Sequence, residues 1–99
     1  MMRHDIEKTL SVTTLLAQME QVAYWLPKRD PGREGLIRSV GDIKRRLEGE
    51  PLSRSEVVDF QMHVWRLKPS LFKTLLNRRV AQFGSLYGVD VLNAARRHR

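Results

Sequence analysis

The chain has 99 residues, no cysteine and a formal net charge of +7, with 41% hydrophobic and 29% charged residues. This length fits one domain with a thin core, and the absence of cysteine excludes disulfides, thiol catalysis and cysteine-based zinc sites. No secretory signal is recognisable, and the longest apolar run, residues 22–26, is far shorter than the roughly 20 residues of a membrane span. We therefore expect a soluble cytoplasmic protein.

Apolar residues recur at three- and four-residue steps in four segments, which predicts four amphipathic helices. The first runs from Ile6 to Leu26, with Asp5 as its N-cap, and the second from Leu36 to Leu47. Breaks rich in proline or glycine at residues 27–32, 49–51 and 68–70 separate the segments, and Gly84 and Gly88 make a softer break.

The third segment opens with the capping box Ser53-Arg54-Ser55-Glu56 and continues through Val57, Phe60 and Val64. The fourth runs from Leu71 to Tyr87, and Asp90 suits the N-cap of a short helix from Val91 to about Arg97. No segment alternates long enough to require a sheet. The sequence thus predicts an all-α fold, a small helical bundle of four main helices plus a short C-terminal helix, as a single domain over residues 1–99.

All of the net charge lies in the last third of the chain. Residues 1–65 hold ten basic and ten acidic residues, whereas residues 66–99 hold eight basic residues and only Asp90 as an acid. Such a gathered charge attracts phosphate or an acidic protein surface. The alternative is a basic surface that only solvates the protein. If the charge serves binding, the expected partner or nucleic-acid contacts are Lys68, Pro69, Lys73, Asn77, Arg78, Arg79, Arg96, Arg97 and Arg99.

Residues that could carry catalysis are sparse. His4, His63 and His98 lie far apart, with no metal-ligand spacing around them, and a pairing of Asp59 with His63 on one helix turn is better explained as a surface hydrogen bond. We expect no enzyme activity, no cofactor and no bound metal. Trp65 and Tyr87 would suit base stacking if exposed, but their helical spacing favours the core.

Two junctions have alternative interpretations. Residues 49–52 match the turn length of a helix-turn-helix, although the following helix does not resemble a recognition helix. At Lys68-Pro69, a proline at the first helical position is the simple interpretation. A slow conformational switch, or a target for a prolyl isomerase, is the alternative.

The stretch Trp65-Arg66-Leu67-Lys68-Pro69-Ser70-Leu71-Phe72, with the helical first half and the basic end, resembles the small anti-RecBCD accessory proteins of lambdoid phages. That resemblance implies a non-enzymatic protein in the host bacterial cytoplasm. It would bind the host RecBCD helicase–nuclease, largely through RecC, alter its Chi-dependent control, and protect or redirect DNA ends for phage recombination. The alternative function is direct binding of DNA or RNA by a small regulator or architectural protein.

Overall fold

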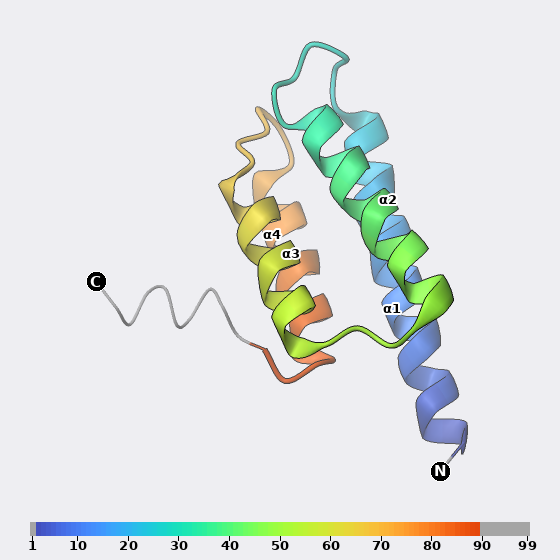
Figure 1. Ribbon diagram of the computed structural model, residues 1–99. Helices are drawn as coiled ribbons and strands as arrows, with labels where there is room; N and C mark the ends of the chain where they lie inside the picture. The colour runs from blue at the N-terminus through green and yellow to red at the C-terminus, as the bar shows by residue number, and fades with distance from the viewer. Residues whose placement is uncertain (1, 90–99) are drawn as a thin grey trace.

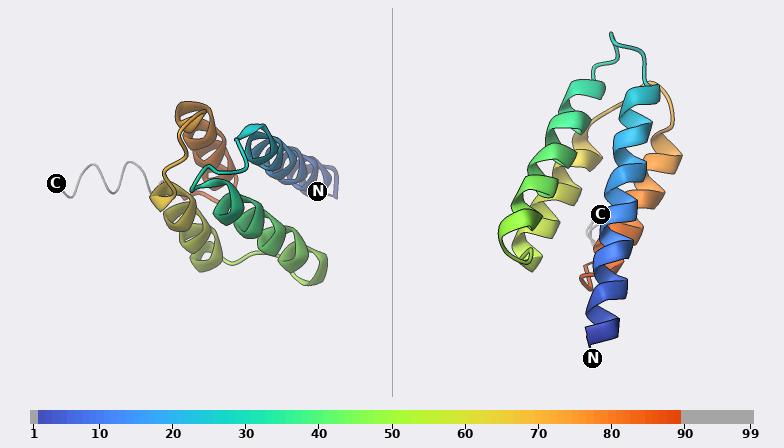
Figure 2. Two further views of the ribbon diagram at one scale, coloured as in Figure 1. Left: turned by 90° about the horizontal axis from the view of Figure 1, so that it is seen from above. Right: turned by 90° about the vertical axis from the view of Figure 1, so that its right-hand side faces the viewer.

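The computed structural model describes the backbone of residues 2–89 and the side chains of residues 11–89. The helices are α1 (Met2–Trp25), α2 (Arg33–Gly49), α3 (Arg54–Arg66) and α4 (Lys73–Ser85). Successive helices run in opposite directions and pack together, and α4 also packs against α1, as Figures 1 and 2 show. Residues 2–89 thus form an all-helical, antiparallel four-helix bundle, which confirms the predicted class and its four main helices. The predicted C-terminal helix, from Val91 to about Arg97 with Asp90 as N-cap, lies outside the described residues.

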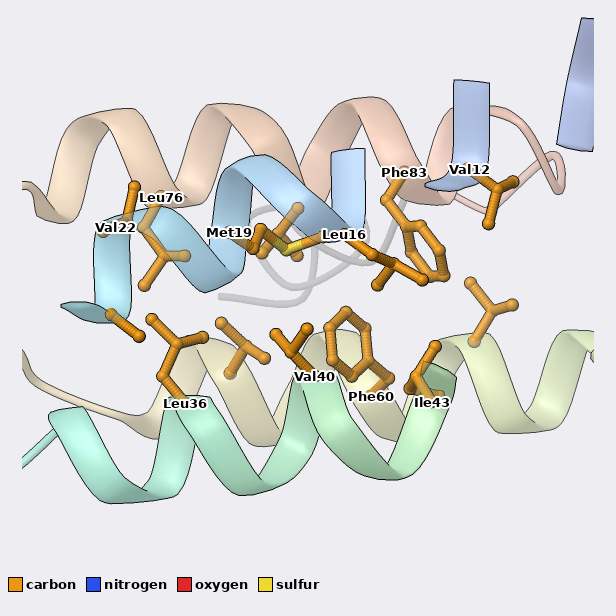
Figure 3. Close-up of a cluster of buried hydrophobic side chains, with 14 of the residues drawn as sticks. Val12, Leu16, Met19, Val22, Leu36, Val40, Ile43, Phe60, Leu76 and Phe83 are labelled. Carbon is orange, nitrogen blue, oxygen red and sulfur yellow. The ribbon is translucent and has the colours of Figure 1, made fainter. Parts of the chain in front are cut away.

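The apolar faces of the four helices meet in one buried cluster (Figure 3). Met19 of α1, Leu36 and Val40 of α2, and Phe83 of α4 have no exposed surface at all. Burial of side chains of this size contributes about 1.5–3 kcal/mol each, so the periodic apolar positions supply most of the driving force for folding. The other buried apolar members are Val12, Leu16, Val22, Ala23, Ile43, Leu52, Val57, Phe60, Val64, Leu76, Val80 and Val89.

The predicted capping box at the start of α3 is confirmed. The Ser53 Oγ atom accepts a hydrogen bond from the Glu56 amide at 3.1 Å, and the Ser53 amide donates to Glu56 Oε1 at 3.1 Å. The bond from the Ser53 amide is the main reason that the pKa of Glu56 lies below its usual value. The predicted cap of the first helix is wrong, because α1 begins at Met2 and Asp5 therefore lies inside the helix.

The fourth helix begins later than the sequence predicts. α4 starts at Lys73, so Leu71 and Phe72 precede the helix, and Pro69 lies in the loop instead of at the first helical position. Phe72, the residue immediately before α4, has a left-handed backbone conformation with φ of 62°. The Asp30 side chain, from the loop between α1 and α2, accepts hydrogen bonds from Ser70 just before this point, as described below.

α3 and α4 approach each other closely at Gly84. Gln61 of α3 is buried, and its Nε2 atom donates a hydrogen bond to the Val80 carbonyl oxygen at 3.1 Å. A Cβ atom on Gly84 would lie 1.9 Å from that Nε2 atom and 2.8 Å from the Val89 carbonyl oxygen. α4 ends at Ser85, one residue after Gly84, and Gly88 has φ of 69°, so the helix ends within the softer break predicted at these glycines.

Replacing Gly84 with alanine is therefore expected to lower the free energy of unfolding by about 1–3 kcal/mol, because the helices must separate to admit the methyl group. Gly41→Ala is the matched control. A Cβ atom there meets only the end of the Arg45 side chain at 3.6 Å, so this change should raise stability by up to about 1 kcal/mol. Urea unfolding followed by circular dichroism measures both. Equal effects of the two substitutions would contradict the close approach.

Candidate functional site

The structure does not bring the predicted basic residues of α4 together on one face. Successive residues of a helix point about 100° apart. Lys73 and Asn77 lie on one side of α4, and Arg78 is exposed. Arg79 is half-buried on the side that faces α1, where it lines a shallow hollow and donates a hydrogen bond to Gln82 Oε1 at 3.0 Å. Arg96, Arg97 and Arg99 lie outside the described residues.

The basic cluster of α2 is neutralised within the bundle. Lys44 contacts Glu20 of α1 at 3.4 Å, and Arg45 pairs with Asp42 one turn earlier. The Arg46 Nε atom lies 2.6 Å from Glu56 Oε2, which links α2 to α3. Lys44 and Arg46 therefore link neighbouring helices, and the charge of Arg45 is neutralised by Asp42 within its own helix. These three cations do not make a free basic surface.

Two loops, the α1–α2 loop and the α3–α4 loop, lie at the end of the bundle that is at the top of Figure 1. Asp30 connects these two loops. Its side chain is only 6% exposed. Oδ1 accepts a hydrogen bond from the Gly32 amide at 2.8 Å, and Oδ2 accepts from the Ser70 amide at 2.8 Å and from the Ser70 hydroxyl. The bond from the Ser70 hydroxyl contributes most to lowering the pKa of Asp30. We call residues 26–32 and 67–72, with the helix ends beside them, the loop end.

An apolar patch lies exposed on this loop end. Trp25 is 53% exposed and Phe72 is 41% exposed, and their ring centroids lie 5.7 Å apart. Tyr24 and Leu71 are exposed as well, and the Arg33 guanidinium lies 5.6 Å from the centre of the Tyr24 ring. The patch joins the end of α1 to the loop before α4, two segments far apart in sequence. Large exposed groups of this kind mark interaction surfaces in soluble proteins.

Phe72 adopts a backbone conformation that is unfavourable for its residue type. A left-handed conformation costs a residue with a large side chain about 1–2 kcal/mol. Phe72 adopts that conformation and still leaves two fifths of its side chain in solvent. Such outliers cluster at binding sites, because the surrounding structure retains them for something other than stability.

Unpaired cations surround the apolar patch. Residues 24–34 and 66–73 contain six basic and two acidic residues, and one of the two acids, Asp30, is buried. Lys28, Arg29, Lys68 and Lys73 are exposed. None of these four makes an ion pair with another side chain of residues 11–89. The loop end is therefore the place where positive charge and exposed apolar surface coincide.

Among the predicted site residues that the structure describes, Lys68, Pro69 and Lys73 belong to the loop end, whereas Asn77, Arg78 and Arg79 do not. The residues that the sequence interpretation missed are Tyr24, Trp25, Lys28, Arg29, Leu71 and Phe72. For Tyr24 and Trp25 a signal existed. Val22, Ala23 and Leu26 share one helix face and are buried, and at 100° per residue the two aromatic residues between them must point away from it. Trp65 is also 40% exposed, contrary to the expectation from its spacing, whereas Tyr87 is half-buried.

Pro69 is buried in the loop end. All peptide bonds of the described residues are trans, and a Cβ atom on Gly32 would lie 3.1–3.3 Å from three atoms of Pro69. The two loops therefore touch through their backbones at Gly32. A prolyl isomerase would reach Pro69 only after this contact and the Asp30 hydrogen bonds had opened.

The described residues give little support for a metal site, a membrane span or a helix-turn-helix. Residues 11–89 contain no group of three or more His, Asp or Glu side chains that could hold a metal ion, and Asp59 and His63 are exposed on α3. None of the described helices has a stretch long and apolar enough to cross a membrane. α2 and α3 run in opposite directions as neighbours in the bundle (Figure 1). Val57, Phe60 and Val64 of α3 are buried in the core. Comparison of the chain with known family models, curated proteins and solved structures found no match.

The Asp30 hydrogen bonds predict a pH dependence of stability. Because the pKa of Asp30 in the folded state lies below its ordinary value of 3.8, its contribution is complete above that value. It is lost as pH falls through the lower folded-state pKa. The difference in Tm between the parent protein and Asp30→Asn should therefore be large at pH 6 and should shrink as pH falls from 4 to 2.5.

Asp59→Asn, at an exposed position of α3, is the control and should change Tm little across this pH range. Differential scanning calorimetry gives the Tm values. A difference for Asp30→Asn that stayed constant down to pH 2.5 would mean that the carboxylate does not connect the loops.

Proposed function

We propose that this protein is a non-enzymatic docking module that binds an acidic and partly apolar surface of a DNA-processing enzyme through its loop end. The observation that carries the proposal is the coincidence of the exposed Trp25–Phe72 pair with the unpaired Lys28, Arg29, Lys68 and Lys73. Aromatic anchors inside a polar, charged rim are typical of protein interfaces, where a few such side chains carry most of the binding energy.

Leu71 favours a protein partner over a nucleic acid. An aliphatic side chain that is 50% exposed gains free energy by entering an apolar pocket, and Leu71 has no charge or hydrogen-bonding group with which to contact a phosphate. The cations would then steer an acidic surface toward the patch and increase the association rate. Because Asp30 fixes both loops, the surface is organised before binding, which lowers the entropy lost on association.

Residues 65–72 resemble the anti-RecBCD accessory proteins, and RecBCD is therefore the first partner to test. These are the residues that form the second half of the loop end. In this proposal the module occupies RecC and changes the enzyme's response to Chi, which protects DNA ends or directs them into phage recombination. In this proposal the DNA binds to the enzyme alone, and the basic surface of the module contacts an acidic surface of the enzyme.

A substitution at Phe72 separates binding from folding. Asparagine tolerates the left-handed backbone, so Phe72→Asn should keep the free energy of unfolding within about 1 kcal/mol of the parent value. Loss of the aromatic anchor should weaken binding to purified RecBCD by at least about tenfold. Biolayer interferometry with the immobilised full-length chain measures the affinity, and urea unfolding measures the stability.

The charged rim has its own matched pair of variants. Lys28→Glu should slow association with RecBCD, whereas Arg45→Glu, in the second half of α2 where Arg45 already pairs with Asp42, should leave it unchanged. If the parent chain shows no binding to RecBCD, or if the Phe72 and Lys28 variants bind as tightly as the parent, the proposal fails.

Direct nucleic-acid binding is a second candidate, since exposed aromatic rings beside cations also suit base stacking. It predicts a complex with bare single-stranded or duplex DNA, or with RNA, that weakens steeply as salt rises. Replacing Lys73, Arg78 and Arg79 with alanine should then flatten the salt dependence in a fluorescence anisotropy titration. Absence of any complex at low salt would exclude this candidate.

A further inference from the structure

An open groove lies at the end of the bundle opposite the loop end. It has a volume of about 710 Å³ and an apolar lining from α1, α2, the α2–α3 connection and the residues after α4. Val12 and Leu16 come from α1, Leu47 from α2, Leu52 from the connection, and Tyr87 from the end of the described chain. Apolar side chains from four separate segments thus converge on a space that no described residue fills.

The edge of the groove is acidic. Glu48 and Glu50 are exposed there, and Glu48 makes no ion pair with the side chains of residues 11–89. Glu50 lies 3.8 Å from an Arg46 nitrogen, but Arg46 has a closer partner in Glu56 at 2.6 Å. Lys44, the one basic residue in the described lining of the groove, pairs with Glu20. A segment that fits this groove should therefore combine apolar and basic side chains.

The described chain ends beside the groove. Tyr87 lines it, Arg54 donates a hydrogen bond to the Gly88 carbonyl oxygen at 3.2 Å, and the Val89 amide donates to the Gly84 carbonyl oxygen at 2.9 Å. In Figure 1 the end of the coloured chain, just after α4, lies at the same end of the bundle as the α2–α3 connection. The ten residues that follow therefore start from a fixed position next to the groove.

Residues 90–99 have the composition that the groove requires. Val91 and Leu92 come first, and Arg96, Arg97 and Arg99 follow, so that the segment carries one acid and three arginines. Leu92 is five residues after Tyr87, and five residues reach roughly 16 Å when extended. A short tether also gives the segment an effective concentration on the order of millimolar, so weak contacts are enough for occupancy.

We propose that residues 90–99 dock in this groove of their own chain, with Val91 and Leu92 against Leu47 and Leu52, and with Arg96 and Arg97 toward Glu48 and Glu50. This arrangement assigns the basic tail an internal acidic partner. It leaves the loop end as the free basic surface, and it makes the tail a segment that another basic, apolar peptide could displace. The proposal does not depend on what the loop end binds.

Disulfide trapping tests this docking in the full-length chain, since the chain has no cysteine of its own. Leu47→Cys combined with Leu92→Cys should form an intrachain disulfide in a monomer, on the order of tenfold faster or more than the control pair Leu71→Cys with Leu92→Cys at the loop end. Mass spectrometry and non-reducing electrophoresis separate intrachain from interchain products, and circular dichroism confirms that both variants fold. Equal rates for the two pairs, or a product that is only a disulfide-linked dimer, would overturn the proposal.

A second measurement does not rely on substitution of the groove. Leu92→Asp in the otherwise unchanged chain should shift the backbone amide NMR signals of Val12, Leu16, Leu47 and Leu52 and leave those of the loop end in place. Glu48→Gln combined with Glu50→Gln should move the same signals in the same direction. Changes restricted to residues near Leu92 in sequence would contradict docking in the groove.

Discussion

The carboxylate of Asp30 is the interaction on which the loop end depends. Residues 26–32 join α1 to α2, and residues 67–72 join α3 to α4, so the two helical hairpins have no chain connection at this end. Asp30 supplies the link by accepting hydrogen bonds from its own loop at Gly32 and from the other loop at Ser70. A buried carboxylate is tolerated here because backbone amides and a hydroxyl replace its water.

The proposed binding surface follows from that link. With Ser70 held, the chain has only Leu71 and Phe72 left before α4 begins, and Phe72 makes the transition in a left-handed conformation beside Trp25. The two ends of the bundle then use their charges differently. At the α2–α3 connection Arg46 is paired with Glu56, whereas at the loop end the exposed lysines meet no acid among the described side chains. The Arg46–Glu56 pair links two helices, whereas the lysines of the loop end make no ion pair with the described side chains.

The sequence predicts the bundle well because the signals that define the helices lie within a few residues of one another. Periodic apolar positions, the Ser53–Glu56 capping box and the glycines near the end of α4 all act within a few residues, and the structure contains each of them. The hydrogen bonds between Asp30 and Ser70 span 40 positions and have no local pattern, so neither they nor the later start of α4 could be predicted. The sequence predicts one binding surface that includes Lys73, Arg78 and Arg79, but helical geometry places Arg78 and Arg79 on different sides of α4.

The central claim is that the loop end, organised by Asp30, is the surface that meets the partner enzyme. Hydrogen–deuterium exchange of the full-length chain, with and without saturating RecBCD, tests it most directly. The account predicts slower exchange on binding at residues 24–33 and 67–74, and unchanged exchange at the α2–α3 connection. Protection confined to the α2–α3 connection, or no protection at the loop end in a complex that has formed, would contradict it.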